Sequence, residues 1–337
     1  MGVIISPAPA QQPAQAGAVP TYCLYGLPVL SEVPLPVPPM RESTGQTPTW
    51  SFRRAAGGEA AAEPDGPVVA TVRLRNGAVV SELHRGPGGI WIRNLGIGIF
   101  HILAGARLVD VYPAAGVQER LLGLVLAGQV STLLLQKQGY PCLHASAVVT
   151  ERGALAFLGP NGRGKSTVVA RFLQQGDALL TDDILPLHLE RGDILGMPGL
   201  PIMKLWSQSV ELALGSSDEL PNVLMNLEKK LVVLEGRYSF AKGPVRLDAL
   251  YFLARYDPIA ARSTATTIDM LDSREGFTTL LAQTAYGSLV APDEAAAFLP
   301  IYARLARQAP VRVLRYPSGF EYQEQVHARL RADCGVV

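Results

Sequence analysis

The segment Gly159–Ser166 reads GPNGRGKS and matches the phosphate-binding pattern G-x-x-x-x-G-K-[ST] at every fixed position. Glycines in such a loop let successive backbone N–H groups point inward, and the start of the following helix adds partial positive charge. Lys165 can then reach the β- and γ-phosphates of ATP, and the Ser166 hydroxyl can bind Mg²⁺. The predicted nucleotide contacts are Gly159, Pro160, Asn161, Gly162, Arg163, Gly164, Lys165, Ser166 and Thr167.

Two adjacent carboxylates, Asp182 and Asp183, follow this loop after one predicted helix and a short apolar strand. One carboxylate is expected to hold Mg²⁺ together with Ser166, and the other to accept the proton of an attacking hydroxyl group. Two carboxylates this close repel each other, which raises the pKa of one unless Mg²⁺ or Lys165 compensates. An exposed pair in a turn or a helix cap is the alternative, but the preceding phosphate loop favours catalysis.

The elements on either side of the loop are those that the motif requires. Residues 154–158 form a short apolar run between two glycines, which indicates a buried strand. After the loop, apolar side chains recur at helical spacing: Val168, Val169, Phe172 and Leu173. Residues 144–149 predict a strand that forms a hairpin with 154–158, and residues 178–181 predict the strand before the Asp pair. In this context a glycine-rich turn without chemical meaning is the weaker interpretation.

Composition and charge restrict the function further. The chain has 337 residues, 48% hydrophobic and 18% charged, as expected for a globular protein of one large or two modest domains. A net charge of +1 argues against a nucleic-acid partner or an acidic membrane surface. Three widely spaced cysteines and no apparent signal peptide predict a cytoplasmic protein. The longest weakly polar run, 121–136, is shorter than a membrane span and predicts a buried helix.

The chain is predicted to consist of a tail and two larger parts. Residues 1–20 are rich in Pro, Ala and Gln and predict a disordered tail. Residues 21–140 predict a small β-rich module with an edge strand and loop (22–39), an exposed loop (41–66), a hairpin at Asn76-Gly77 and a helix (118–138). Residues 141–330 predict the nucleotide-binding core, with later strands at 231–234, 247–253 and 311–314 and helices at 273–281 and 292–307.

Three segments together resemble the HPr kinase/phosphorylase superfamily: Leu143–Val148, Phe157–Thr167 and Leu180–Asp183. Weaker similarities at 26–36 and 197–206 extend the resemblance over nearly the whole chain after the tail. The chain is most similar to the HPr-kinase-like serine kinases associated with lasso-peptide and related peptide-modification systems. The loop also resembles that of ABC transporter ATPases, but the LSGGQ-type signature and the Gln loop of that family are absent from the sequence.

The resemblance implies an α/β (α+β) fold with a P-loop core like that of HPr kinase and phosphoenolpyruvate carboxykinase, preceded by the small β-rich module. It implies that His144, Lys165, Ser166, Asp182 and Asp183 are active-site residues, with Asp182 as the proton acceptor and Asp183 on the metal side. A structural hydrogen-bonding role explains His144 equally well. The E-I-R-G-L-G motif of HPr kinases is absent, which argues against HPr as the acceptor and against the reverse phosphorylase activity.

The sequence therefore predicts an ATP- and Mg²⁺-dependent kinase that phosphorylates a hydroxyl group, with a serine of a small peptide or protein as the leading acceptor. A kinase of free serine and an ATP-binding regulatory or assembly module are the alternatives. Lys230, beside the apolar run 231–234, is predicted to contact the transferred phosphate, the alternative being a solvated basic rim. Relatives in this family often assemble, so a homo-oligomer is a further expectation, although no interface signal stands out in the sequence.

Overall fold

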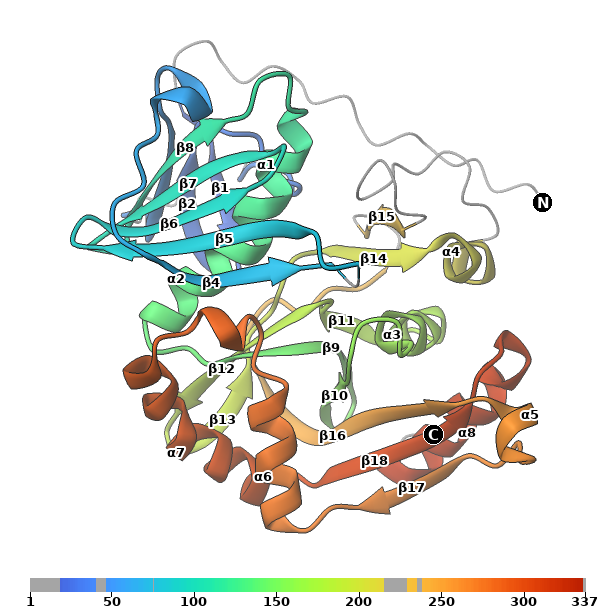
Figure 1. Ribbon diagram of the computed structural model, residues 1–337. Helices are drawn as coiled ribbons and strands as arrows, with labels where there is room; N and C mark the ends of the chain where they lie inside the picture. Colours follow the sequence, from blue (N-terminus) through green and yellow to red (C-terminus); the bar gives the residue numbers. More distant parts are fainter. Residues whose placement is uncertain (1–18, 41–46, 75, 215–228, 235–237, 336–337) are drawn as a thin grey trace.

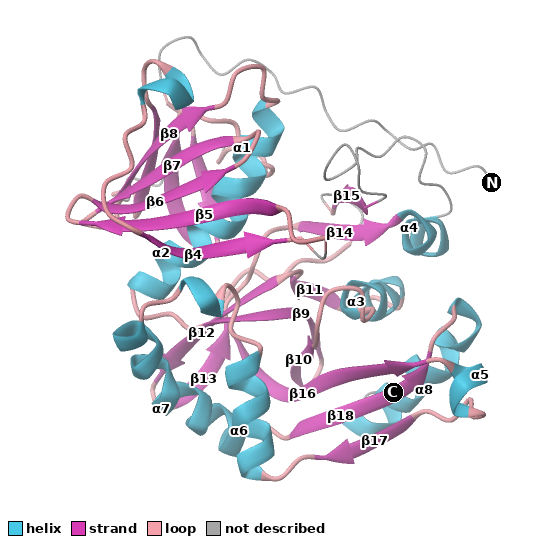
Figure 2. Cartoon of the chain, in the orientation of Figure 1, coloured by secondary structure: helices cyan, strands magenta, loops and turns pink. Residues whose placement is uncertain are grey.

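The computed structural model describes residues 19–40, 47–74, 76–214, 229–234 and 238–335. Figure 1 shows a mixed α/β molecule with two large sheets, one from the N-terminal part of the chain above and one from the C-terminal part below. Figure 2 shows that helices flank the lower sheet on both sides. The mixed α/β class predicted from the sequence is confirmed, whereas nearly all of the predicted tail lies outside the described residues.

The first sheet contains eight strands in the order β1-β2-β3-β8-β7-β6-β5-β4. Its strands are β1 (Thr21–Leu24), β2 (Leu27–Ser31), β3 (Trp50–Arg54), β4 (Val68–Arg73), β5 (Val79–Gly86), β6 (Gly89–Asn94), β7 (Gly98–Leu103) and β8 (Leu108–Pro113). The hairpin predicted at Asn76-Gly77 is confirmed, because β4 and β5 pair antiparallel. The edge strand predicted within 22–39 corresponds to β1, which lies at one end of the sheet.

The prediction of an exposed loop over residues 41–66 is wrong for its central part. Residues 50–54 form β3, which lies inside the first sheet and runs parallel to both neighbours, β2 and β8. Trp50 and Phe52 are buried, while Arg53 and Arg54 on the same strand are exposed. So short a strand could not be predicted because Gly- and Pro-rich segments flank it and because its parallel partners are distant in sequence. A short 3₁₀ helix (Gly58–Ala61) follows.

The helix predicted over residues 118–138 covers the first sheet and is continuous but not uniform. It consists of α1 (Glu119–Val125), a π-helical turn (Leu126–Val130) and α2 (Ser131–Lys137). Its apolar side chains join the core of the first sheet. Two of its buried polar side chains are hydrogen-bonded as follows: Ser131 Oγ donates to the Leu126 carbonyl at 2.7 Å, and Asn94 donates to Gln129 at 3.0 Å. None of the described helices is both long and apolar enough to cross a membrane.

The second sheet carries the candidate site. Its order is β10-β9-β12-β13-β16-β18-β17, and β11 pairs with β9. The strands are β9 (Cys142–Thr150), β10 (Gly153–Leu158), β11 (Ala178–Thr181), β12 (Ile184–Glu190), β13 (Asp193–Gly196), β16 (Val245–Tyr256), β17 (Thr267–Met270) and β18 (Val311–Pro317). The predicted β9–β10 hairpin is confirmed. Because β10 also pairs with β16, the strands from β10 through β9, β12 and β13 to β16 close on themselves.

Strand β10 is apolar at every position because it is buried on both faces. Leu155 and Phe157 point into a core formed with the helix after the phosphate loop, while Ala156 and Leu158 point into the core enclosed by the closed strands. A strand with solvent on one face would alternate apolar and polar residues instead. The uninterrupted apolar run seen in the sequence therefore reflects a central strand, and it anchors the loop that begins at Gly159.

The helices of the C-terminal part flank the second sheet. They are α3 (Lys165–Gln174), α4 (Ser207–Leu214), α5 (Pro258–Ala261), α6 (Ser273–Ala282), α7 (Pro292–Gln308) and α8 (Gln323–Cys334), with short 3₁₀ turns at Gly287–Leu289 and Phe320–Tyr322. The predicted helices at 273–281 and 292–307 correspond to α6 and α7. A small antiparallel ribbon of β14 (Ile202–Trp206) and β15 (Lys229–Val233) lies beside the lower edge of the upper sheet, above α3, in Figure 1.

Candidate functional site

The phosphate-loop motif lies between β10 and α3, as its sequence context predicts. Gly159, Gly162 and Gly164 have φ values of 137°, 82° and 93°, a region that glycine adopts much more readily than residues with a side chain. Gly164 is the residue that caps the start of α3, and Lys165 is the first residue of the helix. The positive-φ glycines and the helix N-terminus therefore lie where the motif requires them, as predicted for a phosphate-binding loop.

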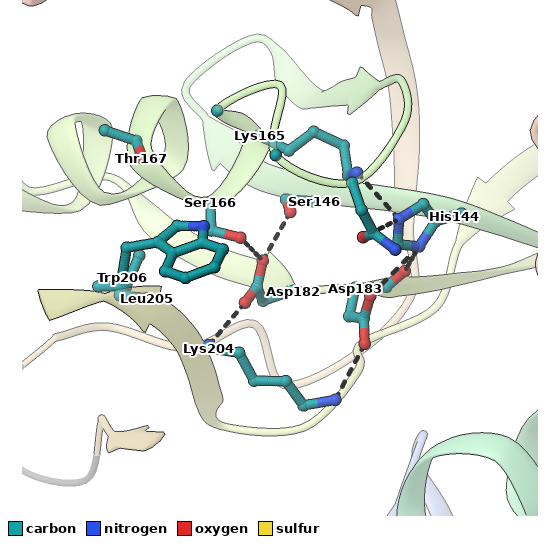
Figure 3. Close-up of a pocket in the computed structure, with 13 residues that line it drawn as sticks. His144, Ser146, Lys165, Ser166, Thr167, Asp182, Asp183, Lys204, Leu205 and Trp206 are labelled. Carbon is teal, nitrogen blue, oxygen red and sulfur yellow. Dashed lines mark hydrogen bonds and ion pairs between the residues drawn. The ribbon is translucent and has the colours of Figure 1, made fainter. Parts of the chain in front are cut away.

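A cavity lies beside this loop (Figure 3). Loop, strand ends and the β14 ribbon all contribute to its lining, which consists of His144, Ser146, Asn161, Gly162, Gly164, Lys165, Ser166, Thr167, Asp182, Asp183, Lys204, Leu205 and Trp206. The structure therefore brings together the predicted catalytic and metal-binding residues, which span about 40 positions of the chain (residues 144–183).

Lys165 is buried at the edge of this cavity. Its Nζ donates to the Gly159 carbonyl at 2.7 Å and lies 2.9 Å from Nε2 of His144. Asn161 Oδ1 lies 3.0 Å from the same ring nitrogen. Nε2 of His144 therefore lies between the ammonium group of Lys165 and the amide oxygen of Asn161, while Nδ1 lies 3.2 Å from the Asp183 carboxylate. His144 thus connects the loop lysine to the Asp pair.

Asp182 is held by three donors around its carboxylate. Ser166 Oγ donates to Oδ1 at 2.7 Å and Ser146 Oγ donates to the same oxygen at 2.6 Å. The backbone N–H of Lys204 donates to Oδ2 at 2.9 Å. Since these contacts fix both carboxylate oxygens, Asp182 has one orientation, with its charge next to the hydroxyl of the phosphate loop (Figure 3).

Asp183 makes a different set of contacts. Its φ of 85° is uncommon for a residue with a side chain, and its carboxylate lies 3.2 Å from His144 Nδ1 and 2.9 Å from Lys204 Nζ. Burial opposes ionisation of Asp183, but the charge of Lys204 and the contact with His144 outweigh it and hold its pKa well below the usual range. The carboxylate in turn raises the pKa of Lys204. Both groups are therefore charged at neutral pH.

Four of the predicted contacts, Gly159, Pro160, Arg163 and Lys230, are not among the described residues that line this cavity. Arg163 Nη1 donates to the Arg255 carbonyl at 2.9 Å, so its side chain is directed toward the end of β16. Thr167 lines the cavity and its hydroxyl lies 3.0 Å from that of Ser209. Lys230 lies in β15 opposite Leu205 and is not one of the described residues that line the cavity. The phosphate contacts of these residues, like those of the whole loop, stay predictions.

Three residues of the site were not predicted from the sequence as site residues. Ser146 lies two positions after His144 on β9, so strand periodicity places both side chains on one face and offers a usable signal. Lys204 lies on β14, a strand without a clear pattern in the sequence. Gln283 accepts from the Gly159 N–H at 3.1 Å through Oε1, and its carbonyl accepts from the His144 N–H at 2.7 Å. The residues next to Gln283 in the sequence do not indicate these contacts with Gly159 and His144.

The oxygen donors of the site fit Mg²⁺ in chemistry. Ser166 Oγ and Asp182 Oδ1 are 2.7 Å apart, and hydroxyl and carboxylate oxygens are the ligands that Mg²⁺ takes alongside substrate phosphates and water. No group of three or more His, Cys, Asp or Glu side chains that could hold a metal ion occurs in the described part of the chain.

The strand that leads to Asp182 depends on a close approach by Gly199. Its N–H donates to the Leu180 carbonyl at 2.8 Å, and an added Cβ would lie 2.0 Å from Oγ1 of Thr181, which directly precedes Asp182. We therefore expect Gly199→Ala to destabilise the fold by about 1–3 kcal/mol, because the strand must move. Chemical denaturation measures this, with Gly105→Ala as the control, since a Cβ there has nothing within 4 Å. Equal unfolding midpoints for the two variants would contradict the expectation.

Comparisons with known proteins give little guidance on function. No family model and no curated protein matches the chain. Among solved structures, the chain is similar to the HPr(Ser) kinase/phosphatase from Coxiella burnetii, with 10% sequence identity, coverage of 57% of this chain and 95% of that chain, and a TM-score of 0.29. A similarity this low supports no conclusion about activity, which has to be argued from the residues of the site.

Proposed function

We propose that this protein is an ATP- and Mg²⁺-dependent kinase that transfers the γ-phosphoryl group to a hydroxyl group, with a core of the HPr-kinase type. The observation that carries the proposal is the convergence of a glycine-rich phosphate loop, Lys165 and the Asp182–Asp183 pair on one cavity. A site for phosphate binding alone needs the loop and the lysine, whereas a kinase also needs a carboxylate for the acceptor hydroxyl and one for the metal ion.

The residues of the chain can perform this transfer largely by positioning and charge. The loop N–H groups hold the phosphates, and Lys165 exchanges its contacts with Gly159 and His144 for phosphate oxygens. Mg²⁺, when bound, neutralises charge on the phosphate oxygens, and Ser166 with Asp182 would hold it. Lys204 supplies a second positive charge at the opposite side of the cavity, where it is held by Asp183.

The contacts favour an exchange of the two Asp roles implied by the family resemblance. Asp182 is bound to Ser166, which is the metal-side hydroxyl of the loop motif. Asp183, by contrast, also lines a wider opening, which His144 and Gln283 line as well and which we assign to the acceptor. We therefore assign Asp182 to the metal side and Asp183 to the acceptor hydroxyl, whose proton it accepts as the oxygen attacks the γ-phosphorus and the bond to ADP breaks.

Paired binding measurements separate the two roles. With Asp182→Asn, we expect the gain in ATP affinity on adding Mg²⁺ to be lost. With Asp183→Asn, we expect that gain to persist while kcat falls about 100-fold or more, because the acceptor carboxylate is removed. Calorimetry with and without Mg²⁺, together with steady-state kinetics, measures both effects. The opposite pattern would restore Asp182 as the proton acceptor.

The preference for a peptide or protein acceptor rests on the family resemblance. The wider opening has a volume of about 720 Å³ and is lined by residues from five segments of the chain, including Ala282–Tyr286 after α6. Small-molecule sites are commonly about 300–1,000 Å³, so an opening of this size takes a serine with its neighbouring peptide groups as well as free serine. A serine within a short peptide, such as a lasso-type precursor, is the leading acceptor because the resemblance favours it.

A γ-labelled ATP assay with Mg²⁺ and three acceptors tests the assignment: peptides encoded beside this gene, an HPr-type protein and free serine. We expect label on a peptide serine. Label on free serine alone would replace the peptide substrate by a small molecule. ATP binding without label on any acceptor would favour an ATP-binding regulatory or assembly module instead.

A further inference from the structure

A second cavity borders the phosphate loop, and neither residue of the Asp pair lines it. It has a volume of about 320 Å³, within the range of small-ligand pockets. Four of its lining residues also line the first cavity, namely Gly162, Gly164, Thr167 and Trp206. The remainder come from α4, the end of β16, β18, the 3₁₀ turn after β18 and the start of α8: Gln208, Ser209, Arg255, Tyr316, Gly319, Phe320 and Gln323.

The direction of a bound triphosphate follows from the proposed function, on which this inference rests. Lys165 and Ser166 fix the β- and γ-phosphates in the first cavity, next to Asp182. The phosphates lie along the loop, so the nucleoside must lie in a space that borders the loop outside the first cavity. The second cavity shares Gly162, Gly164 and Thr167 with the first, but neither Asp182 nor Asp183 lines it.

Two aromatic rings in this cavity are unusually exposed. Trp206 is 41% exposed and Phe320 is 40% exposed, whereas Trp50 and Trp91 elsewhere in the chain are 0% and 7% exposed. Large aromatic side chains contribute most when buried, so two half-exposed rings that line one cavity offer apolar area that a flat ligand can cover. A nucleobase is a flat ring that stacks on such side chains, with a contribution of about 1–3 kcal/mol per base.

Polar groups in the same cavity suit a nucleoside as well. Gln208 and Gln323 both carry an amide, which donates and accepts hydrogen bonds as the edge of a base does. Arg255 places a positive charge at the border of the phosphate loop, and its carbonyl accepts from Arg163 of that loop. Tyr316 OH donates to the Arg163 carbonyl, which fixes the loop against this cavity.

We propose that this second cavity binds the base and ribose of a purine nucleoside triphosphate, with Trp206 and Phe320 as the stacking side chains. A purine presents more ring area than a pyrimidine, so stacking favours it. Trp206 lines both cavities, and it therefore lies where nucleoside and phosphates meet.

Calorimetric binding of ATP and of inorganic tripolyphosphate, both with Mg²⁺, tests the proposal. We expect Phe320→Ala to weaken ATP binding by about 5- to 150-fold, the equivalent of the stacking contribution, and to leave tripolyphosphate binding unchanged. Lys165→Ala should weaken both ligands. Leu299→Ala is the matched control, because Leu299 is 39% exposed on α7, away from this cavity.

Two outcomes would overturn the proposal in different ways. If Phe320→Ala binds ATP as the wild type does while Lys165→Ala loses it, the phosphate loop functions but the nucleoside lies elsewhere. If the wild type binds neither ATP nor tripolyphosphate, the proposed function fails together with this inference. If Phe320→Ala does not fold, quenching of tryptophan fluorescence by acrylamide in the wild type tests the proposal instead. We expect ATP to protect Trp206 from acrylamide more than tripolyphosphate does. Equal protection by the two ligands contradicts the proposal.

Discussion

Replacing Asp182 with Asn is expected to reduce phosphoryl transfer by about 100-fold or more, while the protein stays folded and still binds metal-free ATP. The Asn side chain keeps the shape of the carboxylate but removes its charge beside Ser166. Mg²⁺ would then lose its carboxylate ligand, and electrostatic groups of this kind contribute about 10²–10³ in rate. Kinetics with γ-labelled ATP and the acceptor identified by the three-acceptor assay measure the loss.

Asp193→Asn is the matched control for Asp182→Asn. Asp193 is exposed at the start of β13, and it does not line the described cavity at the phosphate loop. We expect wild-type transfer from this variant. Full transfer by Asp182→Asn would contradict a catalytic role for the Asp182 charge, whichever of the two roles it has.

Replacing Lys165 with Ala is expected to weaken ATP binding by about 10- to 150-fold. Hydrogen bonds made by charged groups contribute about 1.5–3 kcal/mol each, and the lysine is the charged group of the loop that reaches the phosphates. The variant also leaves the Gly159 carbonyl without its bond from Nζ, so the loop loses an internal tether. Calorimetry measures the affinity, and circular dichroism verifies the fold.

Lys137→Ala controls for the loss of one lysine charge. Lys137 pairs with Glu294 at 3.0 Å, in contact with α7, and it does not line the described cavity at the phosphate loop. Its removal should leave ATP binding unchanged. If Lys165→Ala binds ATP as tightly as the Lys137 variant does, the glycine-rich loop is not a nucleotide site.

The local elements of the site could be predicted from the sequence because each one has a strong local signal. The apolar run of β10, the glycines of the loop and the helical spacing in α3 all act within a few residues, and the hairpin with β9 is likewise local. The strand before the Asp pair was also predicted, and it is β11.

Features that depend on distant contacts could not be predicted in the same way. The pairing of β10 with β16, which closes the strands, joins residues about 90 positions apart. The burial of β3 depends on parallel partners on both sides. Lys204 and Gln283 reach the site from β14 and from the end of α6, and no pattern near either residue indicates a phosphate site.

The structure also gives the Asp pair a physical distinction that the sequence lacks. Two adjacent carboxylates look equivalent in the sequence, and mutual repulsion is the simple expectation. In the fold, the positive φ of Asp183 separates their environments: Asp182 is bound by neutral donors, while Asp183 is bound by Lys204 and His144. Opposite charge, rather than repulsion, therefore dominates the environment of Asp183.

Transfer of label from γ-labelled ATP to a serine hydroxyl, with wild type and Asp182→Asn measured side by side, tests the central claim most directly. We expect the wild type to form ADP and phosphoserine in equal amounts, with Mg²⁺ required, and the variant to lose both products together. The contradicting result is a wild type that is saturated with ATP but forms neither ADP nor a labelled product with any of the three acceptors. That result would exclude phosphoryl transfer as the function of this cavity.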